Sequence, residues 1–173
     1  MNDVLEFWFN TLERSDWFKK SDELDARIKA LFETTHQQIM VGETAHWREM
    51  PEGRLAEIIV LDQFSRNMFR GLPESFGSDN LALALAQEAI RCGADHGLDE
   101  SKRTFMYMPF MHSESKLIHE QAMDLFKDLP ALEYEIRHKV IIDQFDRYPH
   151  RNAVLGRQST EEEIEWMQKN RGF

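Results

Sequence analysis

Two copies of one pattern hold the side chains best suited to chemistry. Residues 59–70 read IVLDQFSRNMFR and residues 140–151 read VIIDQFDRYPHR. In each copy an apolar run ends in an aspartate, a glutamine and an arginine, and a second arginine follows. Because polar and apolar positions repeat together, a functional site is expected where these copies lie. The matching residues are 81 positions apart: Asp62 and Asp143, Gln63 and Gln144, Phe64 and Phe145, Arg66 and Arg147, Arg70 and Arg151.

The arginines of the two copies predict a binding site for an anion. If the copies pack side by side, with Asp62 and Asp143 each holding an arginine across the interface, the arginines gather in one region. Guanidinium groups match carboxylate and phosphate oxygens bidentately, and asparagine adds neutral hydrogen bonds. The expected partner is an anionic small molecule or the carboxylate end of a peptide. The candidate ligand-binding residues belong to the copies and the segment after them: Gln63, Arg66, Asn67, Arg70, Arg147, His150, Arg151, Asn152 and Arg157.

A purely structural role for the same charges stays open as an alternative. Asp62 and Arg66, like Asp143 and Arg147, are four positions apart and fit ordinary intrahelical ion pairs. Such pairs are worth roughly a few tenths of a kcal/mol when they are exposed. Arginines near helix ends also cap the last carbonyls. Both pairs, however, follow strongly apolar runs, where a partly buried charge needs a partner.

Acid–base residues in these regions support a further alternative, a hydrolase-type enzyme. Asp62 or Asp143 would act as the base, and His112 or His150 would carry the proton. His112 also begins a His-Ser-Glu segment that, together with His138 or His150, could ligate a metal. The spacing matches no strong metal motif, and the chain lacks the hydrolase, P-loop and dinucleotide fingerprints. No metal and no cofactor is therefore predicted.

Composition indicates a single acidic domain of 173 residues. Apolar residues make up 42% of the chain and aromatic residues 11%, enough for a sizeable core. The formal net charge of −10 argues against nucleic acid and anionic membranes as partners. Residues 147–157 are nevertheless a basic island, with three arginines, one histidine and no acid.

The single cysteine and the absence of targeting patterns predict a cytoplasmic location. Cys92 cannot form an internal disulfide and fits a reducing compartment. It follows an alanine-rich stretch, so we expect it to be a small buried apolar residue. The sequence shows no secretory signal pattern and no apolar run of about 18 residues. It does not indicate an oligomeric state.

Apolar residues recurring every three or four positions predict an all-α protein with about eight or nine helices. Pro109 is expected to end or kink its helix, and Ser78 to cap the one that follows it. Short connections predict antiparallel neighbours in a tetratricopeptide-like array of helix pairs. The similar triplets at 88–90 and 121–123 lie 33 positions apart, near the period of that repeat. The expected helices span 3–12, 22–42, 51–69, 79–90, 99–110, 114–126 and 131–146, with a last helix after a Ser159–Glu162 capping box.

Several segments carry a family resemblance: VLEFWF at 4–9, DQFSRNMFRG at 62–71, YMPFMHSE at 107–114 and RYPHRN at 147–152. Together they resemble an uncharacterised bacterial family, known chiefly as a domain of unknown function, and they span almost the whole chain. The resemblance implies an all-helical, tetratricopeptide-like fold and no established activity. The chain departs from the family pattern at Asp146, where a glycine is more usual, and this questions the local backbone conformation.

Overall fold

The computed structural model describes residues 1–170, and every regular element in this range is a helix. The α-helices are Asn2–Glu6 (α1), Asp22–Met40 (α2), Pro51–Ile59 (α3), Ser65–Met68 (α4), Asp79–Arg91 (α5), Glu100–Met111 (α6), Lys116–Phe126 (α7), Leu132–Phe145 (α8) and Glu161–Lys169 (α9). Two π-helical turns, Phe7–Thr11 and Val60–Phe64, extend α1 and join α3 to α4, which leaves eight continuous helices in the described range. The prediction of an all-α protein is confirmed. None of the described helices is long and apolar enough to cross a lipid bilayer.

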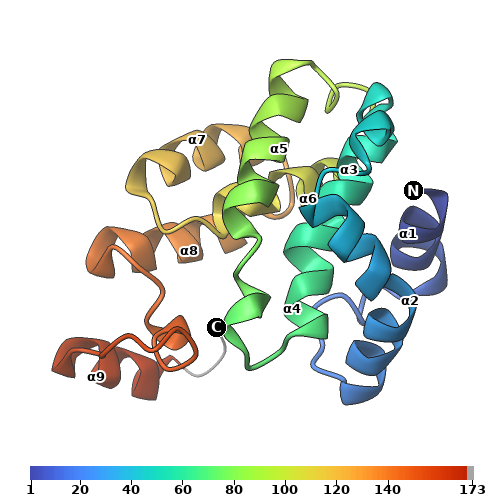
Figure 1. Cartoon of the computed structure of the whole chain (residues 1–173). Coiled ribbons are helices and arrows are strands. Elements are labelled where there is room, and N and C mark those ends of the chain that lie inside the picture. Colours follow the sequence, from blue (N-terminus) through green and yellow to red (C-terminus); the bar gives the residue numbers. More distant parts are fainter. Residues whose placement is uncertain (171–173) are drawn as a thin grey trace.

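The continuous helix from Pro51 to Met68 forms the centre of the molecule. Its backbone stays right-handed helical where α3 meets the π turn and where the turn meets α4. α1 and α2 pack on one side of it, α5 and α6 also contact it, and α7 and α8 pack on the far side against α6 (Figure 1). Because this helix is apolar nearly all round, its polar residues are carried into the core. Its fully buried large side chains are Leu55, Ile58, Ile59, Val60, Leu61 and Phe64.

The first copy of the repeated pattern forms the π turn of this central helix. Asp62 and Gln63 both lie within Val60–Phe64. A π turn adds one residue to a helical turn, is rare, and is often found at functional sites. Both side chains are buried, and Asp62 has no exposed surface. The apolar run that precedes the pattern therefore places a carboxylate inside the protein.

The second copy lies in a different environment, at the end of α8. Asp146 adopts a left-handed conformation with a φ of 57°, and α8 ends just before it. Arg147 therefore does not continue the helix face of Asp143, and it binds Glu163 on α9. Asp143 is exposed and pairs with Lys139, one turn earlier. The expected Asp143–Arg147 pair and the side-by-side packing of the two copies are therefore wrong.

Several helix ends differ from the prediction by one or two residues, and three of them have a consequence for the local structure. α6 continues for two residues beyond Pro109, because a proline near the end of a helix removes only one of its last hydrogen bonds. α7 begins at Lys116 rather than at Glu114. The capping box of α9 uses Thr160 and Glu163, each one position later than expected.

Two small side chains differ from their expected roles. Ser78 precedes α5 but does not cap it, because its hydroxyl donates to the Leu61 carbonyl at 2.6 Å. Cys92 was expected to be buried, yet it is exposed just after α5. Its Sγ lies 3.3 Å from a carboxylate oxygen of Glu88, one turn earlier in α5, so the thiol is in a polar environment and not in the core.

Replacing Asp146 with glycine is expected to stabilise the protein. Glycine enters the left-handed region without the Cβ clash that burdens other residues. The Lys116–Asp146 ion pair that would be lost is exposed and contributes little. Urea unfolding of Asp146→Gly should show a gain of about 0.5–1 kcal/mol. The control Asp143→Gly, inside α8, should instead lose stability, and a loss in both variants would contradict the left-handed conformation.

Candidate functional site

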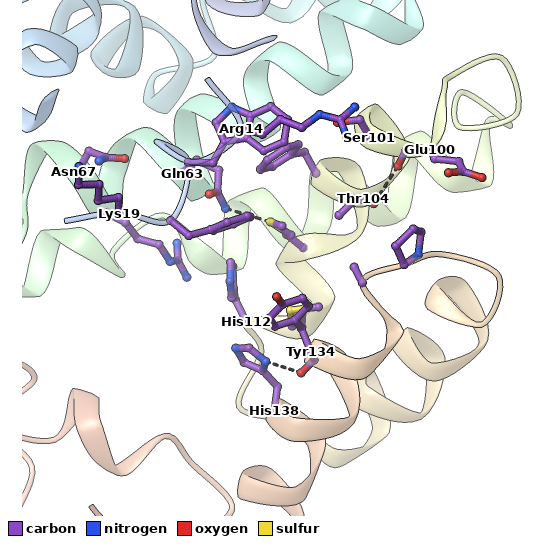
Figure 2. A pocket seen from close by; sticks show the side chains of 18 of the residues that line it. Arg14, Lys19, Gln63, Asn67, Glu100, Ser101, Thr104, His112, Tyr134 and His138 are labelled. Atoms are coloured by element: carbon purple, nitrogen blue, oxygen red, sulfur yellow. Dashed lines mark hydrogen bonds between the residues drawn. The ribbon is translucent and has the colours of Figure 1, made fainter. Parts of the chain in front are cut away.

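A cavity of about 610 Å³ opens beside the C-terminal half of the central helix (Figure 2). Its size lies in the range of small-molecule sites. The loop between the first two helices contributes Arg14, Trp17, Phe18 and Lys19, and the end of the central helix contributes Gln63, Arg66, Asn67 and Arg70. α6 and the residue after it contribute Glu100, Ser101, Thr104, Phe105, Met108, Met111 and His112. α8 and the two residues before it contribute Pro130, Ala131, Tyr134 and His138.

One side of this large cavity is an aromatic wall. Trp17 packs edge-on against Phe105, with ring centroids 4.9 Å apart, and Phe18 stacks on the same ring at 6.3 Å. The indole of Trp17 is anchored by donating to the Trp8 carbonyl at 2.8 Å. Phe18 is 71% exposed, so it contributes little to the core and its ring remains available to a bound molecule.

The opposite side holds a buried carboxylate and a histidine. Nδ1 of His112, at the end of α6, lies 2.7 Å from an Asp62 oxygen. Arg66 approaches the same oxygen at 3.0 Å, which confirms the expected intrahelical pair, and Gln63 donates to the other oxygen at 2.5 Å. Three donors therefore surround a carboxylate that has no contact with solvent, and all three of them also line the cavity.

The charge states of this pair follow from its surroundings. Burial alone would raise the pKa of Asp62, but the charges of Arg66 and His112 outweigh burial and hold that pKa well below its usual range. Burial lowers the pKa of His112 despite the nearby Asp62 charge. An ionised carboxylate only accepts hydrogen bonds, so Nδ1 of the neutral His112 carries the proton. Nε2 of His112 is then an acceptor for a bound molecule.

A second acid organises the arginines. Asp79, at the start of α5, receives two hydrogen bonds of 3.0 Å from Arg66 and one of 3.2 Å from Arg151. Arg151 also donates to the His112 carbonyl at 3.1 Å. Asp79 thus joins the end of the central helix to the turn at residues 149–151.

Arg70 and Asn67 are held from the other side by Asp25 of α2. Arg70 donates to its two carboxylate oxygens at 2.5 and 2.9 Å, and Asn67 donates at 2.8 Å. Burial alone would raise the pKa of Asp25, but these hydrogen bonds and the Arg70 charge lower it. Although both residues line the large cavity, their strongest bonds are internal to the protein.

The structure separates the predicted site residues into three groups. Gln63, Arg66, Asn67, Arg70 and His112 line the large cavity, with Asp62 directly behind His112. His150 and Arg151 line a second, smaller cavity that shares Arg66, Arg70, His112 and His138 with the first. The remaining candidates line neither cavity: Asp143, Arg147, Asn152 and Arg157.

The last group serves the fold around α9 and the basic island. Arg157 donates to both oxygens of Glu114 at 2.6 and 2.9 Å, and also to Asn152 at 2.9 Å. Arg147 is bonded to both oxygens of Glu163. Acids from distant parts of the chain therefore pair with Arg147 and Arg157, two of the three arginines of this island.

Several residues of the large cavity were not identified from the sequence. Arg14 and Lys19 lie in the loop before α2, and Ser101 and Thr104 lie on α6. One feature of the loop sequence could have indicated a binding role. Arg14 and Lys19 lie on either side of the aromatic pair Trp17-Phe18, in a stretch without helical periodicity. Ser101 and Thr104 carry no such signal, because polar residues on the outer face of a helix are common. No group of three or more potential metal ligands occurs among residues 1–170.

Low pH is expected to destabilise the fold through the histidines of the cavity. Burial, the neighbouring His112 charge and other cations lower the pKa of His138 to about 3. Both histidines thus have a folded pKa below the unfolded value of about 6.5, so the unfolded chain binds more protons and stability falls as pH drops through that value. Between about pH 7 and pH 5, urea unfolding of His138→Gln should show up to about 2 kcal/mol less pH dependence than the parent protein. His96→Gln, at an exposed histidine, should match the parent; equal pH dependence in all three proteins would contradict a neutral His138.

Comparison with known proteins identifies relatives of unknown activity. The family model described as "Bacterial protein of unknown function (DUF924)" matches residues 4–171. A solved structure of a protein of unknown function from Agrobacterium tumefaciens is similar, with a TM-score of 0.94 and 35% sequence identity. The similarity covers 98% of this chain and 97% of that one. No curated protein matches the sequence.

Proposed function

We propose that this chain, which belongs to the DUF924 family of bacterial proteins of unknown function, binds a small molecule in its large cavity. The ligand combines an apolar body with an anionic group. The observation that carries this proposal is a cavity lining that combines an aromatic wall with cationic side chains and hydrogen-bonding groups. Small-molecule sites commonly pair a mostly apolar lining with a few convergent polar groups.

The cations available to such a ligand differ from those that the repeated pattern emphasised. Arg66 and Arg70 already form ion pairs with aspartates. Arg14 and Lys19 have no ion pair with any residue in the described range 1–170, although both line the cavity. An anionic group therefore finds its least costly partners in Arg14 and Lys19, because binding there breaks no existing ion pair.

Matched probes test this proposal by thermal unfolding. Phenylacetate has both the apolar ring and the anion, phenylacetamide lacks the charge, and acetate lacks the ring. Phenylacetate should raise the unfolding midpoint more than either of the others, because a ligand that binds only the native state stabilises it. Phe18→Ala should weaken this effect with little loss of stability, since Phe18 is largely exposed.

The cationic end is tested with the double variant Arg14→Gln and Lys19→Gln. It should lose the preference for phenylacetate over phenylacetamide. Lys127→Gln, on the surface beyond α7, is the matched control and should retain that preference. The proposal is wrong if the carboxylate and the amide stabilise the parent protein equally, or if the double variant responds as the parent does.

Acid–base catalysis of a hydrolase type is the second candidate function, and the Asp62–His112 pair favours it. Nε2 of the neutral His112 can take a proton from a water molecule that attacks the bound ligand. Asp62 then stabilises the imidazolium and keeps its ring in place, as an aspartate does behind the histidine of a serine-hydrolase triad. Asp143 is exposed on α8 and lines neither cavity, so it has no part in this candidate.

The tautomer of His112 tests the catalytic candidate without a known substrate. Nitrogen-15 NMR should show a neutral His112 with its proton on Nδ1 at about pH 7. In Asp62→Asn, the amide can donate to Nδ1, so the proton should move largely to Nε2. His96→Gln assigns an exposed histidine and should leave the His112 signal unchanged. A parent protein with the proton on Nε2 would remove His112 as a general base.

The arrangement of the helices and the location of the protein are also proposals. Contacts between successive helices, α5 with α6, α6 with α7 and α7 with α8, support a tetratricopeptide-like array of helix pairs. The exposed Cys92 suits a reducing compartment, which supports a cytoplasmic location. The acidic net charge supports the absence of nucleic-acid and membrane partners.

A further inference from the structure

The second cavity, of about 320 Å³, has a lining unlike that of the first. No acidic side chain of the described range faces it. Three arginines and three histidines line it: Arg66, Arg70, Arg151, His112, His138 and His150. The large cavity mixes cations with Glu100 and an aromatic wall, whereas this smaller cavity combines three guanidinium groups with imidazole rings.

The smaller cavity has an accessible mouth and a buried floor. Arg70, Gly71 and His150 are exposed and mark the side open to solvent. Ser75 and Arg151 are buried and lie at its inner end. An ion can therefore enter from solvent and meet a charged side chain that water reaches poorly, where electrostatic attraction is stronger than at a surface.

Arg151 is fixed in place at the inner end. Its guanidinium lies 4.6 Å from the centre of the Phe76 ring and 4.4 Å from the centre of the Tyr148 ring. Its two terminal nitrogens bond Asp79 and the His112 carbonyl. Its Nε is buried and has no hydrogen-bond partner among the described residues. A buried donor without a partner costs free energy that an added acceptor would recover.

The guanidinium groups behind the cavity repel each other, and a bound anion would reduce this unfavourable electrostatic energy. Arg66 and Arg151 both bind Asp79; Arg66 has a second acid in Asp62, whereas Arg151 shares its acid partner with another guanidinium. Burial and the neighbouring charge of Arg66 lower the pKa of Arg151. His150 sits at the mouth, its ring 5.5 Å from that of Tyr148. It can donate a hydrogen bond without being charged.

We propose that this smaller cavity is a phosphate-binding site that acts independently of the ligand site in the large cavity. A carboxylate offers two oxygens in one plane, which one guanidinium satisfies. A phosphate offers oxygens in a tetrahedron, and the three arginines and His150 can donate to it from more than one side of the cavity. The phosphate belongs either to inorganic phosphate or to a phosphomonoester.

Isothermal titration of the full-length protein with inorganic phosphate tests the site. Saturable binding to one site is expected, with sulfate competing because it has the same shape. Acetate at the same concentration should not compete. A parent protein that binds neither inorganic phosphate nor the phosphomonoester phenyl phosphate overturns the proposal, and so does acetate that displaces phosphate as well as sulfate does.

Two variants assign the binding to the cavity. Arg151→Lys keeps the charge and the reach to Asp79 but loses Nε and the planar fork, so phosphate affinity should fall by roughly tenfold or more. His150→Gln, at an exposed position that folding does not depend on, should weaken binding by a smaller factor. Phosphate binding that is unchanged in both variants overturns the proposal.

Controls separate this site from the large cavity and from surface charge. Arg137→Gln removes an exposed arginine outside both cavities, and Thr104→Val changes only the large cavity. Both should bind phosphate as the parent does; a loss in Arg137→Gln equal to that in Arg151→Lys overturns the proposal. Binding of phenyl phosphate without inorganic phosphate assigns the ligand to phosphomonoesters if Arg151→Lys weakens it and the Arg14→Gln, Lys19→Gln double variant does not; the reverse pattern overturns the proposal.

Discussion

The burial of the Asp62 carboxylate is the constraint on which the rest of the structure depends. An ionised carboxylate without water is tolerated only when it is surrounded by donors and paired with positive charge. Asp62 obtains these from Arg66, His112 and Gln63. Arg66 is then itself a buried cation, and Asp79 completes its pairing. One buried charge thus ties together the central helix, the end of α6 and the start of α5.

Internal ion pairs also occupy other arginines that the sequence marked as candidate ligand-binding residues. Arg66, Arg147 and Arg157 each bind an acid from a distant part of the chain, and none of these partners is suggested by local spacing. If a cation that stabilises a buried acid moved to a ligand, the acid would lose its positive partner. An unpaired charge in the interior has a large desolvation free energy, so this exchange is unfavourable. This is the reason why both proposed anion sites use cations with fewer acid partners, in the loop before α2 and around Arg151.

Helical periodicity was sufficient to predict the all-α fold and the burial of the central helix, because both follow from the spacing of apolar residues. The site was only partly predictable. The π turn leaves no mark in the apolar pattern, yet it sets the direction of Asp62. α8 ends one residue before its expected end, and the left-handed Asp146 that follows, with a φ of 57°, turns Arg147 away from Asp143; helical spacing alone does not predict this turn. Loop residues such as Lys19 became cavity residues through tertiary packing, which short-range spacing does not encode.

His112 connects the two cavities, and its position gives them a common physical basis. Its ring is bonded to Asp62 and faces both cavities, while its carbonyl accepts a hydrogen bond from Arg151. The residue follows the last turn of α6 directly, after a proline that has already removed one hydrogen bond from that turn. The two cavities have different linings, yet one residue contributes to both walls.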